Sequence, residues 1–108
     1  MRGLRVATRN GTANVLLSVE GEVDLATAPE LEGALQRALQ SPARRLVVDL
    51  RAVQFLDSSG LSVLVRQDRL ARAGERQLVI VKPPPQVHQV FELTGLSRHL
   101  TMVDEPPG

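Results

Sequence analysis

Hydrophobic and polar residues alternate along two N-terminal segments, residues 4–9 and 15–20, as expected for half-buried strands. The segment between them begins with Asn10 and Gly11, a pair that favours a tight reversal of the chain. We therefore predict that the chain opens with a β-hairpin, after which residues 21–24 carry it away from the second strand.

A helix is predicted next, because leucine and alanine recur at helical spacing across residues 31–39. Thr27, Pro29 and Glu30 precede this pattern in the arrangement of a capping box. In such a box the Thr27 hydroxyl accepts from the amide of Glu30, and the Glu30 carboxylate accepts from the amide of Thr27. Pro42 then ends the helix, since proline cannot continue one.

Two short runs of nearly continuous apolar residues, 46–50 and 78–81, have the pattern of strands covered on both faces. The segment between Gly60 and Gly74 is rich in leucine and valine, and its first half is apolar nearly all round. We expect a deeply packed helix there. Strand, helix and strand in this order predict a central βαβ unit with parallel strands.

The last quarter of the chain begins with a stiff connector of three prolines, residues 83–85. Residues 86–93 place apolar side chains on one face of a predicted helix, and Gly95 is its expected C-terminal cap. Residues 99–103 are predicted to form a short final strand, and residues 104–108 a frayed tail.

The composition narrows the class of protein. The chain has 108 residues, 13 Lys plus Arg against 12 Asp plus Glu, no cysteine and 2% aromatic residues. A chain of this length buries roughly two thirds of its unfolded surface, so we expect residues 1–108 to form a single α/β domain without disulfides. The near-neutral charge and scarcity of aromatic rings argue against nucleic acid as a partner. No apolar stretch approaches the roughly 18 residues that cross a bilayer, so we expect a cytoplasmic protein without direct membrane contact.

Candidate chemistry is concentrated at Asp57, Ser58, Ser59 and Gly60, between a buried strand and an apolar helix. In open α/β sheets functional groups collect at this edge. The structural interpretation is an N-cap, worth about 1 kcal/mol. Three consecutive capping residues beside free helix amides favour instead a serine that receives a phosphoryl group.

An enzyme is the weaker interpretation. A catalytic serine needs a base in reach, and the two histidines, His88 and His99, both lie in the last quarter of the chain. Residues 56–60 also lack the Gly-x-Ser-x-Gly pattern. We expect no cofactor and no metal, because the sequence has neither a phosphate loop nor clustered ligands. For the acidic pair Glu22 and Asp24, a structural role, as solvated loop charge or as acids at a helix N-terminus, and a partner contact remain equally open.

The order of these elements, and several motifs, resemble the STAS domain family and, within it, stand-alone anti-sigma factor antagonists. The resemblance covers nearly the whole chain and implies a mixed β-sheet with helices packed mainly on one side. It rests on segments 21–24, 47–50 and 55–61 and on Pro85, Val87, Phe91, Gly95 and Leu96.

The resemblance also implies partner switching. In this family the unphosphorylated antagonist binds an anti-sigma factor that is also an ATP-using serine kinase, and so frees a sigma factor for transcription. Phosphorylation of the first serine of the motif, here Ser58, ends binding until a serine phosphatase restores it. The implied partner-binding residues are Gly21, Glu22, Val23, Asp24, Asp57, Ser58, Ser59, Gly60 and Leu61.

STAS domains also serve in membrane transport complexes, so one alternative is that the same face docks on a transport ATPase without any kinase. The sequence leaves open which sigma factor and kinase are involved and whether the protein dimerises. The family usually adds a C-terminal helix, whereas this sequence ends a few residues past Val103. We therefore expect the sheet to be less well covered there.

Overall fold

A computed structural model describes residues 3–107 of the chain. Five strands form one sheet in which the spatial order of the strands follows their order in the chain. The first pair is antiparallel and the other three pairs are parallel, so the predicted opening hairpin and mixed sheet are confirmed. The strands are β1 (Leu4–Asn10), β2 (Asn14–Val23), β3 (Arg45–Leu56), β4 (Gln77–Val81) and β5 (Thr101–Val103).

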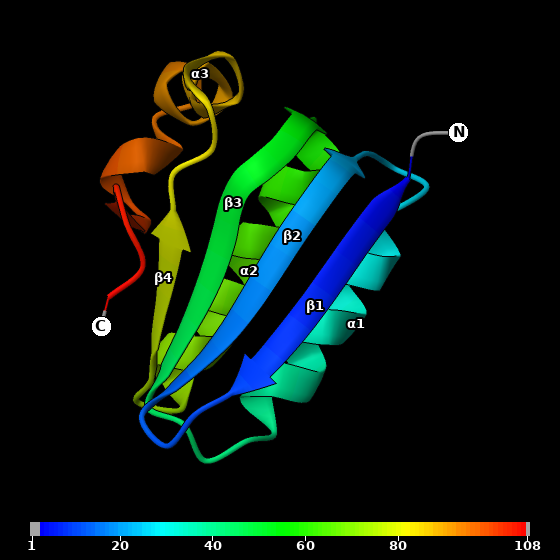
Figure 1. Ribbon diagram of the computed structural model, residues 1–108. Helices are drawn as coiled ribbons and strands as arrows, with labels where there is room; N and C mark the ends of the chain where they lie inside the picture. The colour runs from blue at the N-terminus through cyan, green and yellow to red at the C-terminus, as the bar shows by residue number, and fades with distance from the viewer. Residues whose placement is uncertain (1–2, 108) are drawn as a thin grey trace.

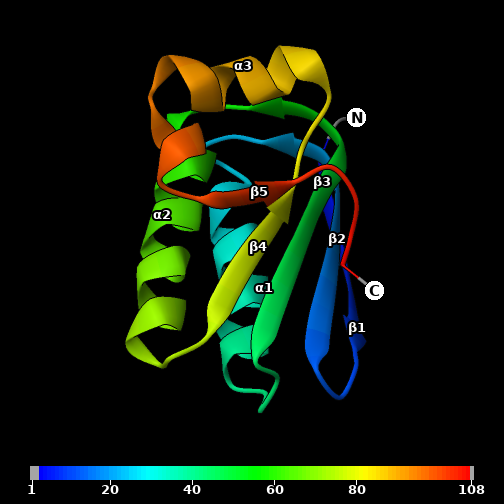
Figure 2. The same ribbon diagram turned by 90° about the vertical axis from the view of Figure 1, so that its left-hand side faces the viewer.

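Helices make each parallel connection. α1 (Ala28–Leu39) links β2 to β3, α2 (Ser58–Ala73) links β3 to β4, and α3 (Pro85–Leu93) with the 3-10 turn η1 (Leu96–Arg98) links β4 to β5. The predicted βαβ unit is present and is flanked by two further parallel crossovers. Figures 1 and 2 show α1 and α2 side by side on one face of the sheet, with α3 across one end. None of the described helices combines the length and apolar character needed to cross a membrane.

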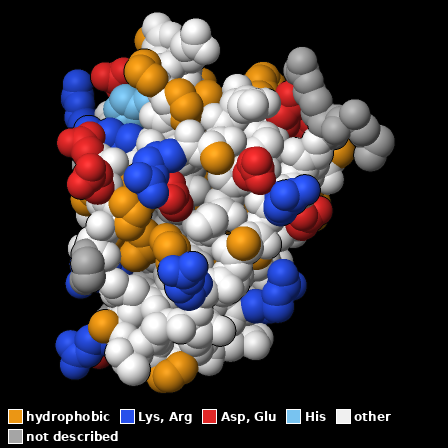
Figure 3. All heavy atoms as spheres, viewed as in Figure 1, with side chains coloured by type: hydrophobic (Ala, Val, Ile, Leu, Met, Phe, Trp, Pro, Cys, Tyr) orange, Lys and Arg blue, Asp and Glu red, His pale blue; other side chains and the backbone are white. Residues whose placement is uncertain are grey.

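The hydrophobic core lies between the sheet and its helical layer. Leu31 of α1, Leu64 of α2 and Phe91 of α3 are completely buried. Alternate residues of β3, including Leu46 and Val48, meet them from the sheet. The helix-free face of the sheet is different, because charged side chains of both signs are spread over it (Figure 3). The helices therefore cover mainly one side, as expected.

β3 is longer than the predicted strand 46–50. In its second half the buried side chains fall at every third position, at Leu50, Val53 and Leu56. The register with β2 shifts twice in this half, and each shift inserts an extra residue into β3. Such bulges bend a strand and re-aim the side chains that follow. They bring β3 to the start of α2.

The predicted capping box at the start of α1 is wrong. The Thr27 hydroxyl donates to the carbonyl oxygen of Glu22 at 2.8 Å and accepts from the amide of Asp24 at 2.9 Å. It makes no cap hydrogen bond to α1. The backbone of Thr27 is already helical, with φ −99° and ψ −17°, whereas a capping side chain needs an extended residue. The amide of Glu30 donates instead to the carbonyl oxygen of Thr27 at 3.0 Å.

The C-terminal elements follow the prediction closely. Gly95 has φ +78° just after α3, a left-handed conformation that glycine adopts without strain, and it ends the helix as expected. Residues 104–107 form no helix or strand. Asp104 nevertheless pairs with Lys82 at 3.3 Å, and Pro106 and Pro107 are half-buried.

Candidate functional site

Ser58 presents a free hydroxyl at the first turn of α2. Asp57 is the N-cap residue, with extended backbone (φ −108°, ψ −170°), and its Oδ1 accepts from the amide of Ser59 at 2.9 Å. The predicted N-cap is thus confirmed at Asp57. Ser58 is exposed, and its hydroxyl makes no hydrogen bond within the described part of the chain. The cap uses the carboxylate of its neighbour and leaves this hydroxyl available.

The backbone that carries Ser58 is held tightly against the sheet. A Cβ on Gly60 would lie 2.8 Å from Val23 Cγ1 and 3.0 Å from Leu56 Cγ, so only glycine allows this close approach. The amide of Asp57 also donates to the carbonyl oxygen of Val23 at 3.1 Å. The start of α2 is therefore fixed to the ends of β2 and β3.

The neighbouring loop, residues 22–27, is closed by the carboxylate of Asp24. Its Oδ1 accepts from the amide of Thr27 at 2.9 Å, the amide of Ala26 at 3.0 Å and the Thr27 hydroxyl at 3.1 Å. These hydrogen bonds, led by the one from the Thr27 amide, hold the pKa of the Asp24 carboxyl below its usual value. The Asp24 carboxylate is thus engaged with its own loop.

Three large exposed apolar side chains belong to or follow elements that end at or cross this end of the molecule (Figure 1). The described residues contain four large exposed apolar side chains. One of them, Leu70 (51% exposed), lies near the C-terminal end of α2 and so away from Ser58. The other three are Leu25 (80%), which follows β2, Phe55 (47%), near the end of β3, and Leu93 (79%), the last residue of α3. A partner that covers this end of the molecule would bury them. We call Leu25, Phe55 and Leu93 the apolar rim.

A shallow hollow of about 320 Å³ adjoins Ser58 on the helical side. It lies between α2 and the 3-10 turn, where Leu96 contributes one wall and Arg66 another. Arg66 forms a two-point ion pair with Glu32 of α1, at 2.9 and 3.0 Å, and this pairing lowers the pKa of the Glu32 carboxyl. Neither histidine lines the hollow, so it provides no imidazole base for Ser58.

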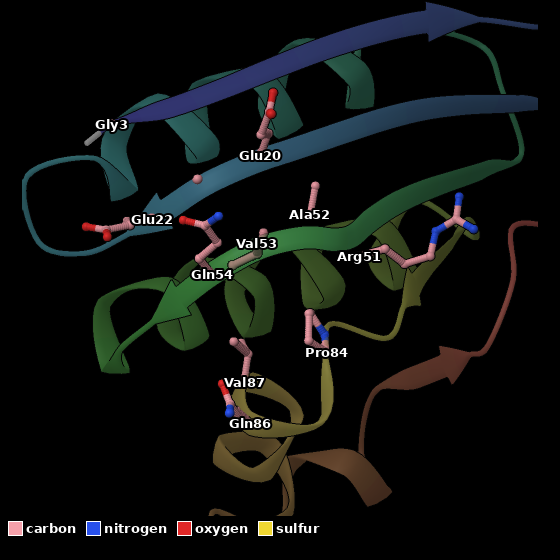
Figure 4. A pocket seen from close by; sticks show the side chains of 11 residues that line it. Gly3, Glu20, Glu22, Arg51, Ala52, Val53, Gln54, Pro84, Gln86 and Val87 are labelled. Carbon is pink, nitrogen blue, oxygen red and sulfur yellow. The ribbon is translucent and has the colours of Figure 1, made fainter. Parts of the chain in front are cut away.

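A second hollow, of about 590 Å³, lies on the helix-free face of the sheet. Figure 4 shows it between the ends of β2 and β3 and the start of α3. Its polar side chains are carboxylates and amides, such as Glu22, Gln54 and Gln86, together with Arg51. Ser58 is not part of this lining, so the predicted site and this hollow are separate.

The predicted partner-binding residues come together at the carboxyl ends of β2 and β3, but only some reach the surface. Ser58 alone is exposed. Half-buried positions are Gly21, Glu22, Asp24, Asp57 and Ser59. Three of the predicted residues are buried and support the surface from below: Val23, Gly60 and Leu61. Leu61 also lines the hollow beside Ser58.

The sequence of this chain is similar to proteins of one family. Residues 6–104 match the family model described as "Mlab, STAS domain". An anti-sigma-B factor antagonist of Staphylococcus aureus is 34% identical over 80 residues, which cover 74% of each chain. An anti-sigma-B factor antagonist of Listeria monocytogenes is 34% identical over 86 residues, covering 80% of this chain and 75% of the relative.

Solved structures of anti-sigma factor antagonists have a similar fold. The crystal structure of an anti-sigma factor antagonist from Mycobacterium paratuberculosis has a TM-score of 0.87 at 29% identity, covering 95% of this chain and 87% of that one. The anti-sigma factor antagonist SpoIIAA in its unphosphorylated form has a TM-score of 0.78 at 20% identity, with 94% and 90% covered. The phosphorylated form of this Bacillus protein has a TM-score of 0.70 at 19% identity, with 94% and 93% covered. The predicted mixed α/β fold is confirmed.

Proposed function

The chain belongs to the STAS domain family, and we propose that it is an anti-sigma factor antagonist, whose unphosphorylated form binds an anti-sigma factor and so releases a sigma factor. The curated relatives that carry this name match across about three quarters of the chain. The observation that carries the proposal is the exposed, unbonded hydroxyl of Ser58, set at a rigid helix start beside the apolar rim.

The proposed partner is an anti-sigma factor that is also a serine kinase using ATP. The kinase would phosphorylate Ser58. In this reaction the Ser58 oxygen forms a bond to the γ-phosphorus of ATP, the bond from that phosphorus to ADP breaks, and the hydroxyl proton passes to a base of the kinase. The exposure of Ser58 supports this role. Its hydroxyl also has no hydrogen bond within the described chain that must be broken first.

Phosphorylation is proposed to end binding through local charge. The phosphoryl group brings close to two negative charges to a surface bordered by Leu25 and Phe55. The carboxylate of Asp57 stands beside it and opposes the added charge, and this carboxylate already accepts from the amide of Ser59, which is therefore not free for the phosphate. Burying such a charge in an interface without a partner costs several kcal/mol. A serine phosphatase would restore the binding form.

The alternative is a subunit that docks the same face on the ATPase of a membrane transport complex. Exposed apolar side chains at this end of the molecule suit either partner. The two functions differ in what happens to the hydroxyl, because docking on a transport ATPase leaves Ser58 unmodified.

The test uses purified anti-sigma factor kinases from the organism that encodes this chain. Binding is measured with ADP, and the chain is then incubated with ATP and followed by intact mass. We expect one kinase to form a complex with ADP and to add one phosphoryl group with ATP. The Ser58→Ala variant should bind without gaining mass. Failure of every kinase to bind or label the chain, with tight binding to a transport ATPase, would establish the alternative.

A further inference from the structure

We propose that Leu25 anchors the chain to the partner of the Ser58 surface and that Thr27 is a positioning residue that presents Leu25. This inference rests on the proposed function and extends it, because neither residue belongs to the partner-binding set that the sequence predicts. It assigns the partner an apolar pocket that receives one leucine side chain beside Ser58.

Leu25 is 80% exposed, the highest value among the large apolar side chains at this end. A single exposed leucine needs no explanation, but three of the four such residues of the described chain form the apolar rim. Leu25 also lies close to Ser58 through the backbone. Val23, two residues before it, accepts a hydrogen bond from the amide of Asp57, which directly precedes Ser58.

The loop that carries Leu25 is locked on both sides of it. On the N-terminal side, the amide of Asp24 donates to the Thr27 hydroxyl at 2.9 Å. On the C-terminal side, the amide of Ala26 donates to the Asp24 carboxylate at 3.0 Å. The Thr27 hydroxyl donates in turn to the carbonyl oxygen of Glu22 at 2.8 Å. The backbone around Leu25 is therefore ordered before any partner arrives.

Order of this kind matters for binding. A side chain on a mobile loop must lose conformational freedom in the complex, and that loss weakens binding. Leu25 avoids most of this cost, because its backbone is already held by the hydroxyl of Thr27 and the carboxylate of Asp24. An exposed apolar side chain on a rigid loop has the properties of an interface anchor. Thr27 acts through Leu25 and needs no contact of its own.

The first experiment measures affinity for the anti-sigma factor kinase that labels this chain, with ADP so that Ser58 stays unmodified. Leu25→Ser should weaken binding roughly tenfold or more, because the anchor is lost. Leu70→Ser is the matched control, since Leu70 is 51% exposed near the other end of α2, and it should bind within about twofold of wild type. Thermal unfolding confirms that both variants are folded. Equal affinities for Leu25→Ser and wild type would overturn the inference while leaving the proposed function intact.

The second experiment separates positioning from general stability. Thr27→Val removes the hydroxyl and keeps the shape, whereas Thr27→Ser keeps the hydroxyl. We expect Thr27→Val to weaken binding and Thr27→Ser to restore it. In the Leu25→Ser background, Thr27→Val should have no further effect, because Thr27 acts only through Leu25. Losses that add in the double variant would contradict the positioning role. If wild-type protein binds no kinase, the proposed function fails first, and the anchor role fails with it.

Discussion

Two hydroxyl residues occupy corresponding places in the molecule and behave in opposite ways. Thr27 and Ser58 each lie at the start of a crossover helix that follows a strand, at the same end of the sheet. The Thr27 hydroxyl interacts with three groups of its own loop, whereas the Ser58 hydroxyl has no partner in the described chain. The comparison indicates that availability distinguishes a structural hydroxyl from a candidate modification site.

The aspartate that precedes each hydroxyl explains the difference. Asp57 is adjacent to Ser58, and its carboxylate reaches past that residue to the amide of Ser59. Asp24 lies three residues before Thr27, and the longer loop folds back so that carboxylate and hydroxyl meet at 3.1 Å. The length of the loop therefore decides whether the hydroxyl joins the hydrogen bonds of the loop or is left without a partner.

The largest expected effect comes from placing a charge on the free hydroxyl position. Ser58→Asp should weaken binding to the anti-sigma factor kinase by about 2–5 kcal/mol, because a charge is desolvated without a partner. Ser58→Ala should bind as wild type does and become insensitive to ATP. Titration calorimetry with ADP measures both affinities.

The control for this pair is Thr12→Asp, which adds the same charge in the exposed hairpin turn at the opposite end of β2. It should bind as wild type does. Indistinguishable affinities for Ser58→Asp and Ser58→Ala would show that a charge at position 58 does not control binding.

A smaller effect is expected from loosening the start of α2. Gly60→Ala should lower the free energy of unfolding by about 1–3 kcal/mol, because its Cβ would collide with Val23 and Leu56. Gly33→Ala in α1 is the matched control. There the new Cβ meets only the flexible end of Arg37, at 3.4 Å, so helix propensity should stabilise the protein by up to about 1 kcal/mol. Urea denaturation measures both changes, and a fully stable Gly60→Ala variant would show that α2 is not held as described.

The smallest effect concerns pH at the loop of Thr27. The pKa of the Asp24 carboxyl lies below its ordinary value of 3.8, chiefly because the amide of Thr27 donates to it. The unfolded chain therefore takes up this proton at higher pH than the folded chain. The stabilisation is complete above the unfolded value and is lost as pH falls through the folded one.

Amide resonances of Ala26 and Thr27, followed by NMR during acid titration, report this protonation. We expect their midpoint below 3.8 in wild type and no such transition in Asp24→Asn. A midpoint at or above the ordinary value would contradict the hydrogen-bonded loop.

The regular elements were predictable because their side-chain periods are simple. The helical spacing across residues 31–39 and the apolar run 78–81 correspond directly to α1 and β4. The second half of β3 could not be predicted from the sequence, because two bulges replace the two-residue period of a strand by a three-residue one. A pattern of this kind is readable only once the partner strand is known.

The capping box failed for a related reason. Thr27 and Glu30 have the spacing of a box, but Asp24 lies outside that motif and competes for the same amide. The Asp24 carboxylate accepts from the Thr27 amide at 2.9 Å in place of the Glu30 carboxylate, and the Thr27 hydroxyl donates to the carbonyl oxygen of Glu22 instead of capping the helix. Local motifs do not include such competitors.

The candidate site was predicted in part. The segment 57–60 was singled out because capping residues follow a buried strand, a signal that is local in sequence, whereas the choice of Ser58 within it came from the family resemblance. Leu25, Phe55 and Leu93 were missed, because leucine and phenylalanine usually belong to the core and their exposure depends on tertiary packing.

Mapping the phosphoryl group after incubation with the kinase and ATP identifies which hydroxyl of the chain is modified. Peptide mass spectrometry distinguishes Ser58 from Thr27 and Ser59, which lie at the same end of the sheet. We predict one phosphoryl group on Ser58 and none on Thr27, whose hydroxyl is engaged in its own loop. Phosphate on Thr27 or Ser59, with Ser58 unmodified, would contradict it.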